Sequence, residues 1–465
     1  MREPYQKPVL VRHRLGALNP FARPQVTLPG GRLDGFSPDD LVARHGSPLF
    51  VISEAELRRR YRELDRAFRL RYPRTTIGYS YKTNYLSAIC AVLRQEGAWA
   101  EVVSGFEYDI ALALGVPGSE IIFNGPMKRR HELEQAVADG ALIHADSLEE
   151  VADLEAIGAR LGRRIPIGLR VNMRLTDEPW DRFGFNLENG DARQMAARVA
   201  SSPSLRLSGL HTHVGTYITD VDVYARAAVR VAELCADLRR GSGVELDHLD
   251  FGGGFAARTR LHGQALPVEH VVPSIDRYAE ALTSALMRGD FPVDRLPRLI
   301  IEPGRALVAE AVQLITSVVS CKRLSDGRRG LVLDAGVNLL PTSWWYEFDV
   351  MAVKETSGVV DTVNLYGPMC MNIDCLRQNV PLPPVGAGDL LVVRNVGAYN
   401  LAQSMQFIQL RPAVVMLGDG GVELVREAET AAYARQLEHV PVRLVSMPAP
   451  DDGAPSPRED GARRS

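Results

Sequence analysis

Several candidate functional groups of this 465-residue chain stand at the ends of short apolar runs. Lys82 ends the run that begins at Thr76, while Glu302 and Arg305 follow the run that begins at Pro297. A lysine at a strand end is commonly a solvated cap, although a desolvated lysine can serve as a Schiff-base nucleophile. A carboxylate beside a guanidinium can be a plain ion pair at a domain boundary. Neither feature alone indicates an enzyme.

Two further runs end in residues suited to an aromatic ligand with an anionic group. His211 and His213 alternate at the end of one run, and Asp250 precedes three consecutive glycines, 252–254. The two histidines could bind a metal, but no carboxylate or cysteine stands at ligand spacing, so we expect no metal site. A flat imidazole can instead stack on an aromatic ring. Glycine runs are usually turns, yet their backbone N–H groups can also approach a phosphate closely.

Together, these groups are the set needed to hold pyridoxal phosphate. In this interpretation Lys82 binds the aldehyde, His213 lies on the ring face and Glu302 pairs with the pyridine nitrogen. The glycines and Arg305 bind the phosphate. This interpretation requires that all of these residues lie close together at one end of the predicted strands.

Eight mostly apolar runs predict the strands that would position these groups. The segments between several of them have helical periodicity, and the segment before the first run places Leu57, Tyr61, Leu64 and Phe68 on one stripe. This alternation predicts a parallel sheet, and the number eight favours a closed (β/α)8 barrel over an open doubly wound sheet. In such a barrel the functional groups lie where the strands end. The runs span residues 76–82, 99–103, 120–124, 141–145, 165–171, 206–213, 246–252 and 297–302.

The pattern changes at about residue 306. Runs at 312–319, 330–334, 390–396 and 413–417 are separated by turn residues and lack long helical patterns, which predicts an antiparallel β domain. We therefore predict an α/β protein with a (β/α)8 barrel and a C-terminal antiparallel β domain. The expected boundaries are 1–45 for an N-terminal segment joining the β domain, 46–305 for the barrel, 306–440 for the β domain and 441–465 for a disordered tail.

Composition excludes several classes of protein. With 46% hydrophobic residues, 24% charged residues and a net charge of -3, the chain has the composition of a soluble globular protein without a basic nucleic-acid patch. No run approaches the ~18 apolar residues of a membrane span, and the N-terminus lacks the apolar core of a signal peptide. Its 5 cysteines form no CxxC pair. We expect a cytoplasmic protein with reduced thiols and with neither a nucleic-acid nor a membrane partner.

At these residues the sequence resembles the fold type III pyridoxal-phosphate decarboxylases, the alanine-racemase-like family that acts on ornithine, lysine, arginine and diaminopimelate. The resemblance spans about residues 40–430 and implies the barrel and β domain, pyridoxal 5'-phosphate as cofactor, and a head-to-tail homodimer with active sites at the interface. Twelve ordered motifs carry it: YSYKTN, EVVSGFE, FNGP, ADSLEE, RVN, RFGF, HTHVGT, DFGGGF, EPGRAL, DAGVN, YGPMCMNID and GAY.

The resemblance also implies a role for each matching residue. Lys82 would carry the cofactor covalently, and Glu302 would keep its ring nitrogen protonated, which favours decarboxylation because racemases of this fold carry an arginine there. Cys370 of the partner subunit would protonate the α-carbon. The other implied cofactor contacts are His213, Thr216, Gly253, Gly254, Gly304, Arg305 and Tyr399, and the implied substrate contacts are Tyr346, Met371 and Asp374.

Two departures from the family pattern concern the substrate. Diaminopimelate decarboxylases carry an arginine and a glutamate where this chain has Thr342 and Met371, and ornithine-type enzymes carry an aspartate at the latter position. Neither side chain here can pair with a distal charge. We therefore expect an amino acid with a neutral, acylated or carrier-linked distal end, of the kind used in siderophore or antibiotic assembly. Trp344 and Trp345 would line its site or belong to the β-domain core.

Two alternatives stay open at this point. Diaminopimelate or a basic amino acid would be the substrate if its anchors were relocated. A catalytically silent regulatory homologue is a function of another class. The retention of Lys82, His213, Glu302, Arg305 and Cys370 argues against the silent homologue.

Overall fold

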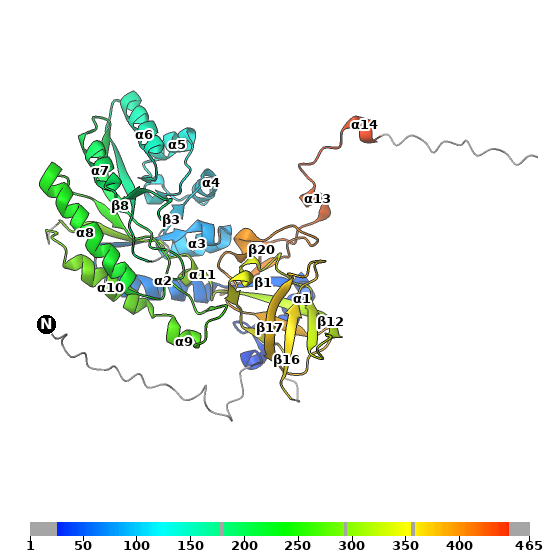
Figure 1. Ribbon diagram of the computed structural model, residues 1–465. Coiled ribbons are helices and arrows are strands. Elements are labelled where there is room, and N and C mark those ends of the chain that lie inside the picture. The colour runs from blue at the N-terminus through cyan, green and yellow to red at the C-terminus, as the bar shows by residue number, and fades with distance from the viewer. Residues whose placement is uncertain (1–25, 177–179, 293–294, 355–358, 446–465) are drawn as a thin grey trace, which may run out of the picture. The chain divides into compact units, whose positions relative to one another are not determined.

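Eight parallel strands close into a barrel, and each corresponds to one predicted run. The sheet runs β5-β4-β3-β2-β11-β9-β8-β6, and pairing between β5 and β6 closes it, so the predicted (β/α)8 barrel is confirmed (Figure 1). The two-residue strand β7 (Phe185–Asn186) adds to β6. The barrel strands are β2 (Thr75–Ser80), β3 (Trp99–Val102), β4 (Ile121–Phe123), β5 (Leu142–Ala145), β6 (Ile165–Asn172), β8 (Leu205–His211), β9 (His248–Asp250) and β11 (Arg298–Ile301).

This computed structural model describes residues 26–176, 180–292, 295–354 and 359–445. The chain forms two units, Met1–Ala428 with the barrel and the β domain, and Glu429–Ser465. Within its described residues the second unit holds only the short helices α13 (Ala431–Ala434) and α14 (Val442–Val445). The expected tail at 441–465 thus begins with a helical turn, and its residues from 446 onward lie outside the described part. None of the described helices has the length and apolarity needed to cross a membrane.

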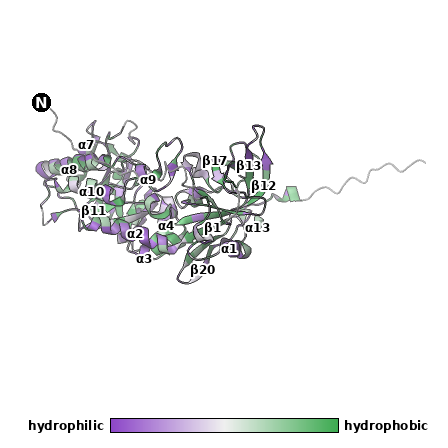
Figure 2. Cartoon of the chain, turned by 90° about the horizontal axis from the view of Figure 1, so that it is seen from below, coloured by the Kyte–Doolittle hydropathy of each residue, from purple (hydrophilic) through white to green (hydrophobic). Residues whose placement is uncertain are grey.

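The barrel helices are amphipathic. In α2, the predicted stripe of Leu57, Tyr61, Leu64 and Phe68 is buried, and Ser53 caps the helix by accepting the Glu56 N–H at 3.1 Å. Hydrophilic residues are visible along α2 and α8 in Figure 2. The longer helices are α1 (Pro38–His45), α2 (Glu54–Arg69), α3 (Ser87–Gln95), α4 (Gly105–Ala113), α5 (Arg130–Asp139), α6 (Leu148–Leu161), α7 (Asp191–Ser201), α8 (Asp222–Ser242) and α10 (Ile275–Met287). Short helices are α9 (Val268–Val271), α11 (Arg305–Val308) and α12 (Asn400–Gln403).

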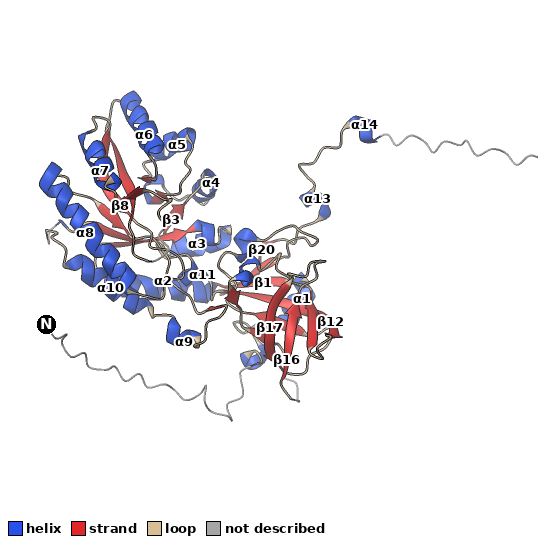
Figure 3. Cartoon of the chain, in the orientation of Figure 1, coloured by secondary structure: helices blue, strands red, loops and turns tan. Residues whose placement is uncertain are grey.

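The second domain consists mainly of strands (Figure 3). Its sheet runs β17-β16-β13-β12-β1-β19-β20, and β18 pairs with both β12 and β15. Most pairs are antiparallel, as predicted, but β1–β19 and β13–β16 are parallel, so the sheet is mixed. The strands are β1 (Leu49–Ser53), β12 (Val312–Arg323), β13 (Arg329–Leu333), β15 (Val350–Ala352), β16 (Asp361–Tyr366), β17 (Cys375–Leu382), β18 (Leu390–Val393), β19 (Val414–Gly418) and β20 (Gly421–Arg426).

Described segments before and after the barrel strands both contribute to this second sheet. Strand β1 follows the expected barrel boundary at residue 46, yet it pairs with β12 and β19, so the barrel strands begin only at β2. Thr27 forms a bridge with Ala352 of β15. A two-stranded ribbon of β10 (Arg260–Leu261) and β14 (Tyr346–Glu347) joins the loop after barrel strand β9 to the β domain. The β domain is thereby attached beside the carboxyl ends of the barrel strands.

Candidate active site

Lys82 lies immediately after β2, in the short turn Tyr81–Thr83, and its ammonium contacts a buried carboxylate. Lys82 Nζ is 2.8 Å from Glu101 Oε2, and Glu101 is 1% exposed. Burial alone would lower the pKa of Lys82, but the nearby Glu101, Tyr399 and Glu302 raise it above its ordinary value. Lys82 is therefore a cation held in place by Glu101.

Glu302, directly after β11, lies among buried polar groups at the ends of neighbouring strands. Its Oε1 accepts a hydrogen bond from Asn124 Nδ2, and its Oε2 lies 3.7 Å from His211 Nε2. Burial raises the pKa of Glu302 and of nearby Asp250, and their mutual repulsion raises that of Glu302 further. The ligand atoms of His144, Asp250 and Glu302 lie within 4.8 Å of one another. A cation next to Glu302 would stabilise its ionised carboxylate.

The glycine run lies against His213 and the chain segment after β8. Gly253 N donates to His213 Nδ1 at 3.1 Å, and a Cβ at Gly253 would lie 2.3 Å from the carbonyl oxygen of Glu302. Gly254 has a φ of +92°, and a Cβ there would lie 2.4 Å from the carbonyl oxygen of Gly215. Only glycine allows this close packing of the loop. Thr216 is exposed next to this loop.

Arg305 and two tyrosines of the β domain extend the same rim. The Arg305 guanidinium lies 4.4 Å from the ring centroid of Tyr346 and 5.1 Å from that of Tyr399. The backbone N–H of Tyr399 donates to the carbonyl oxygen of Thr83 at 2.8 Å. Gly304 packs so closely on this turn that a Cβ would lie 1.9 Å from Thr83 Oγ1. The second domain therefore contributes side chains beside the lysine.

These groups fit pyridoxal phosphate on structural grounds. The glycine loop 252–254 packs so closely on His213 and on the carbonyl oxygens of Glu302 and Gly215 that no side chain fits there. Among the described residues, Thr83 Oγ1, both ring nitrogens of His211 and Asp250 Oδ2 are buried without a hydrogen-bond partner in the protein. Such atoms indicate a site built for a polar ligand. The structure thus brings together Lys82, the glycine loop, Glu302 and the Arg305–tyrosine cluster.

The implied interface residues lie elsewhere, on the loop between β16 and β17. Cys370 is exposed and Met371 is 37% exposed. Asp374 is 2% exposed, and its two carboxylate oxygens accept the backbone N–H groups of Val337 and Met369, both at 2.8 Å. The Asp374 carboxylate therefore organises the loop of its own subunit, while Cys370 and Met371 face outward.

The positions that depart from the family pattern also have definite environments. Thr342 is 4% exposed, and its hydroxyl donates to Asn400 Oδ1 at 2.8 Å. Trp344 and Trp345 are 55% and 59% exposed, so they do not belong to the β-domain core.

Sequence reasoning missed most of the polar interior of the barrel. Glu101, Asn124, His144, His248 and Asp250 are at most 3% exposed and surround Glu302 or each other. Glu101 and Asn124 lie inside the motifs EVVSGFE and FNGP, but the sequence alone indicates no role for either residue. A polar residue at the end of an otherwise apolar run was the available signal.

Comparison with known proteins is consistent with this geometry. Residues 54–309 match the family model of the pyridoxal-dependent decarboxylase, pyridoxal binding domain. A diaminopimelate decarboxylase of Actinosynnema pretiosum is 34% identical over 412 residues, which cover 86% of this chain and 90% of that protein. Another from Methanothermobacter thermautotrophicus is 29% identical over 87% of this chain and 95% of its own length. The crystal structure of diaminopimelate decarboxylase from Methanocaldococcus jannaschii superposes with a TM-score of 0.83 at 26% identity, covering 90% of this chain and 99% of that one.

Proposed function

Because the chain belongs to the pyridoxal-dependent decarboxylases, we propose that its substrate is an α-amino acid with a neutral, acylated or carrier-linked distal end. The chain is a pyridoxal-phosphate-dependent amino acid decarboxylase, and the proposal concerns which amino acid it accepts. The observation that carries the proposal is the environment of Thr342. It is buried and bonded to Asn400, so it offers no charge to a substrate.

Met371 supports the same proposal. Its exposed thioether can contact an apolar or acylated chain but cannot pair with an ammonium or a carboxylate. Burying an unpaired distal charge against it would cost several kcal/mol, so a charged distal end would bind weakly. Trp344 and Trp345 directly precede the buried Tyr346 in the chain. Their exposed side chains add apolar surface next to that tyrosine.

We assign a separate role in the reaction to each residue of the rim. Bound pyridoxal phosphate supplies an electron-withdrawing ring that takes up the electrons left behind when CO₂ departs. Lys82 would hold the cofactor, and the carboxylate of Glu302 would keep the ring nitrogen protonated. Gly253, Gly254, Thr216 and Tyr399 would approach the phosphate, and His213 would cover the ring.

The last step requires a proton at the α-carbon. We assign it to the Sγ of Cys370 of the partner subunit, in a homodimer with shared sites, because Cys370 is exposed on its own loop and free to contact another chain. The expected reaction then releases CO₂ and the amine.

A second candidate substrate is diaminopimelate. The names of the relatives favour it, and the guanidinium of Arg305 could donate hydrogen bonds to a distal carboxylate. In this case the anchors for the distal end would have moved from the positions of Thr342 and Met371 to the tyrosine-lined rim.

A substrate panel separates the two candidates. CO₂ release by the purified holoenzyme would be measured with meso-diaminopimelate, lysine, ornithine, Nε-acetyllysine and Nδ-acetylornithine at equal concentrations. We expect the acetylated compounds to react fastest. A kcat/KM for meso-diaminopimelate of about 10⁴ M⁻¹s⁻¹ or more would establish the second candidate instead. A holoenzyme that decarboxylates none of them, nor a carrier-linked amino acid, would contradict both.

The assignment of Lys82 has its own test. Borohydride reduction followed by peptide mapping should find the cofactor on Lys82 and nowhere else. Lys128 is the comparison, because it too is paired with a buried carboxylate, Glu150, at 2.8 Å. Lys82→Ala should abolish labelling and Lys128→Met should not, whereas a label on Lys128 would overturn the assignment.

A further inference from the structure

A chain of hydrogen bonds runs from Glu302 into the interior of the barrel. Asn124 Nδ2 donates to Glu302 Oε1 and, at 3.1 Å, to Glu101 Oε1. The other end of the amide, Asn124 Oδ1, lies 2.7 Å from His144 Nδ1. His144 Nε2 lies 2.9 Å from His248 Nε2. Asn124, His144 and His248 thus form one continuous connection behind Glu302.

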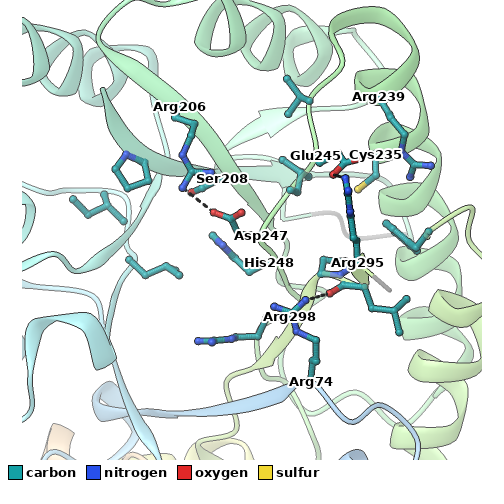
Figure 4. Close-up of a pocket in the computed structure, with 18 of the residues that line it drawn as sticks. Arg74, Arg206, Ser208, Cys235, Arg239, Glu245, Asp247, His248, Arg295 and Arg298 are labelled. Carbon is teal, nitrogen blue, oxygen red and sulfur yellow. Dashed lines mark hydrogen bonds and ion pairs between the residues drawn. The ribbon is translucent and has the colours of Figure 1, made fainter. Parts of the chain in front are cut away.

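The far end of this chain reaches the opposite end of the barrel. His248 begins β9 and lines a cavity of about 560 Å³ at the amino ends of the strands. Figure 4 shows His248 beside Asp247 and Arg206, whose side chains form an ion pair at 2.8 Å. The connection therefore spans the barrel from this cavity to the rim that carries Lys82.

Two glycines make room for the histidines. A Cβ at Gly168 would lie 2.2 Å from His144 Cδ2, and a Cβ at Gly209 would lie 2.1 Å from His248 Nε2. Any side chain at either position would displace an imidazole. The glycines of the neighbouring strands β6 and β8 therefore provide the space that the two imidazole rings occupy.

The donors and acceptors along the chain can be assigned from its rim end. Glu101 is paired with the ammonium of Lys82, so its carboxylate only accepts, and the Asn124 amide must direct its NH₂ group toward the carboxylates. Asn124 Oδ1 then accepts, and His144 Nδ1 must carry the hydrogen. Burial lowers the pKa of His144 far below its ordinary value and that of His248 to about 4, so both rings are neutral near pH 7. His144 Nε2 must accordingly accept from a protonated His248 Nε2.

We propose that His144 and His248 are positioning residues that lock the amide of Asn124 with its nitrogen toward Glu302, and thereby keep Glu302 an anion beside the ring nitrogen of the cofactor. The inference rests on the proposed pairing of Glu302 with that nitrogen. Neither histidine touches the reacting atoms.

The physical basis is the rotation of one amide group. Without the Nδ1–H of His144, only Glu101 and Glu302 hold the NH₂ group of Asn124, and an amide that turns its oxygen toward Glu302 is stable only beside a protonated carboxylate. A protonated Glu302 would no longer hold a proton on the ring nitrogen. The other charged or titratable groups around Glu302 are Lys82, Glu101, Arg170, His211 and Asp250.

The first test needs no cofactor. Two-dimensional ¹⁵N–¹H spectra of the cofactor-free protein with labelled histidine should show His144 protonated at Nδ1 and His248 protonated at Nε2, both exchanging slowly with solvent. His144→Gln and His248→Gln would assign the two resonances. A His144 ring protonated at Nε2 would overturn the inference, without bearing on the proposed substrate.

The second test measures the ring nitrogen directly. The protein is reconstituted with pyridoxal phosphate carrying ¹⁵N in the ring, and the ¹⁵N shift is recorded at neutral pH. We expect a protonated nitrogen in the wild type, a shift toward neutral pyridine in His144→Leu and in His248→Leu, and restoration in His248→Gln, whose amide can still donate to His144. His131→Leu, on the exposed surface of α5, is the matched control.

Folding is monitored by circular dichroism in every variant. If His144→Leu does not fold, His248→Leu carries the test, since the ring at 248 does not touch Asn124. An unchanged ¹⁵N shift in a folded His248→Leu would overturn the inference. Failure to bind the cofactor in the wild type would instead contradict the proposed function.

Discussion

The hydroxyl of Thr342 donates to Asn400 Oδ1 at 2.8 Å, and the backbone N–H of Thr342 donates to the same oxygen at 3.2 Å. Asn400 Nδ2 in turn donates to the carbonyl oxygen of Val396 at 3.0 Å. These bonds join the turn at Pro341–Trp344 to the segment that carries Tyr399. The position expected to hold a charged anchor for diaminopimelate is thus part of the internal packing.

Thr342→Val should therefore change stability and leave the substrate ranking intact. The variant loses one buried hydrogen bond, while Asn400 Oδ1 still accepts from the backbone, so the free energy of unfolding should fall by about 1 kcal/mol. Urea unfolding and the CO₂-release panel are the two measurements. Thr283→Val is a matched control, because the Thr283 hydroxyl makes a comparable buried bond to Ala279 at 2.7 Å on α10. A reversed substrate ranking in Thr342→Val would mean that this hydroxyl contacts the substrate.

Met371→Glu should move the preference toward amino acids with a distal ammonium. The side chain is partly exposed, so a carboxylate there is tolerated, and a charge-assisted hydrogen bond to an ammonium should raise kcat/KM for ornithine or lysine about tenfold. Met287→Glu adds the same charge to an exposed position at the end of α10 and should have no effect. Equal effects of the two variants would show that net charge, and not position 371, controls the preference.

Sequence patterns predicted the barrel well because its signals are local. Each apolar run is short, is bounded by polar residues and precedes a helical segment, and each became one of the eight strands. Strand β1 has the same local appearance, but its partners lie at Val312–Ile315 and Val414–Leu417, more than two hundred residues away. No local pattern distinguishes a barrel strand from a strand of the second sheet in this case.

The residues at the rim of the barrel could be predicted because they stand at the ends of the apolar runs. The hydrogen-bonded network inside the barrel could not, because it depends on the register between neighbouring strands. Ile122 pairs with Leu142 and Phe123 with Ile143, which places Asn124 beside His144. The sequence shows neither this pairing nor the partners of Asp374, one of which is the backbone of Val337. The contacts of Asp374 with the backbone of its own loop could therefore not be predicted from the motif that contains it.

Shared active sites predict recovery of activity in mixed dimers. Lys82→Ala and Cys370→Ala should each be nearly inactive, because one removes the cofactor attachment and the other the proposed proton donor. After subunit exchange, half of the dimers are mixed and each carries one intact site of two, so about a quarter of the wild-type activity should return. Exchange would be confirmed with differently tagged subunits. Mixed dimers that stay inactive would place Cys370 outside the partner's site.

Glu107 gives the cofactor-free protein a predictable pH dependence. It lies in α4, 6% exposed, and although it accepts the Val103 N–H at 2.8 Å, burial raises its pKa from 4.5 to about 7. Because the folded state holds this proton more tightly than the unfolded chain, the stabilisation is complete below about pH 4.5. It is lost as pH rises through about 7, a change of about 3 kcal/mol at most.

Glu107→Gln should remove this slope, since an amide does not titrate in that range. The measurement is urea unfolding of the cofactor-free wild type and the variant at about pH 5 and about pH 8. We expect the wild type to lose more stability than the variant between the two values, with the difference confined to this window. Glu132→Gln, the same substitution at a partly exposed position in the first turn of α5, is the control. Parallel curves for the wild type and Glu107→Gln would show that Glu107 is already ionised in the folded protein at about pH 5.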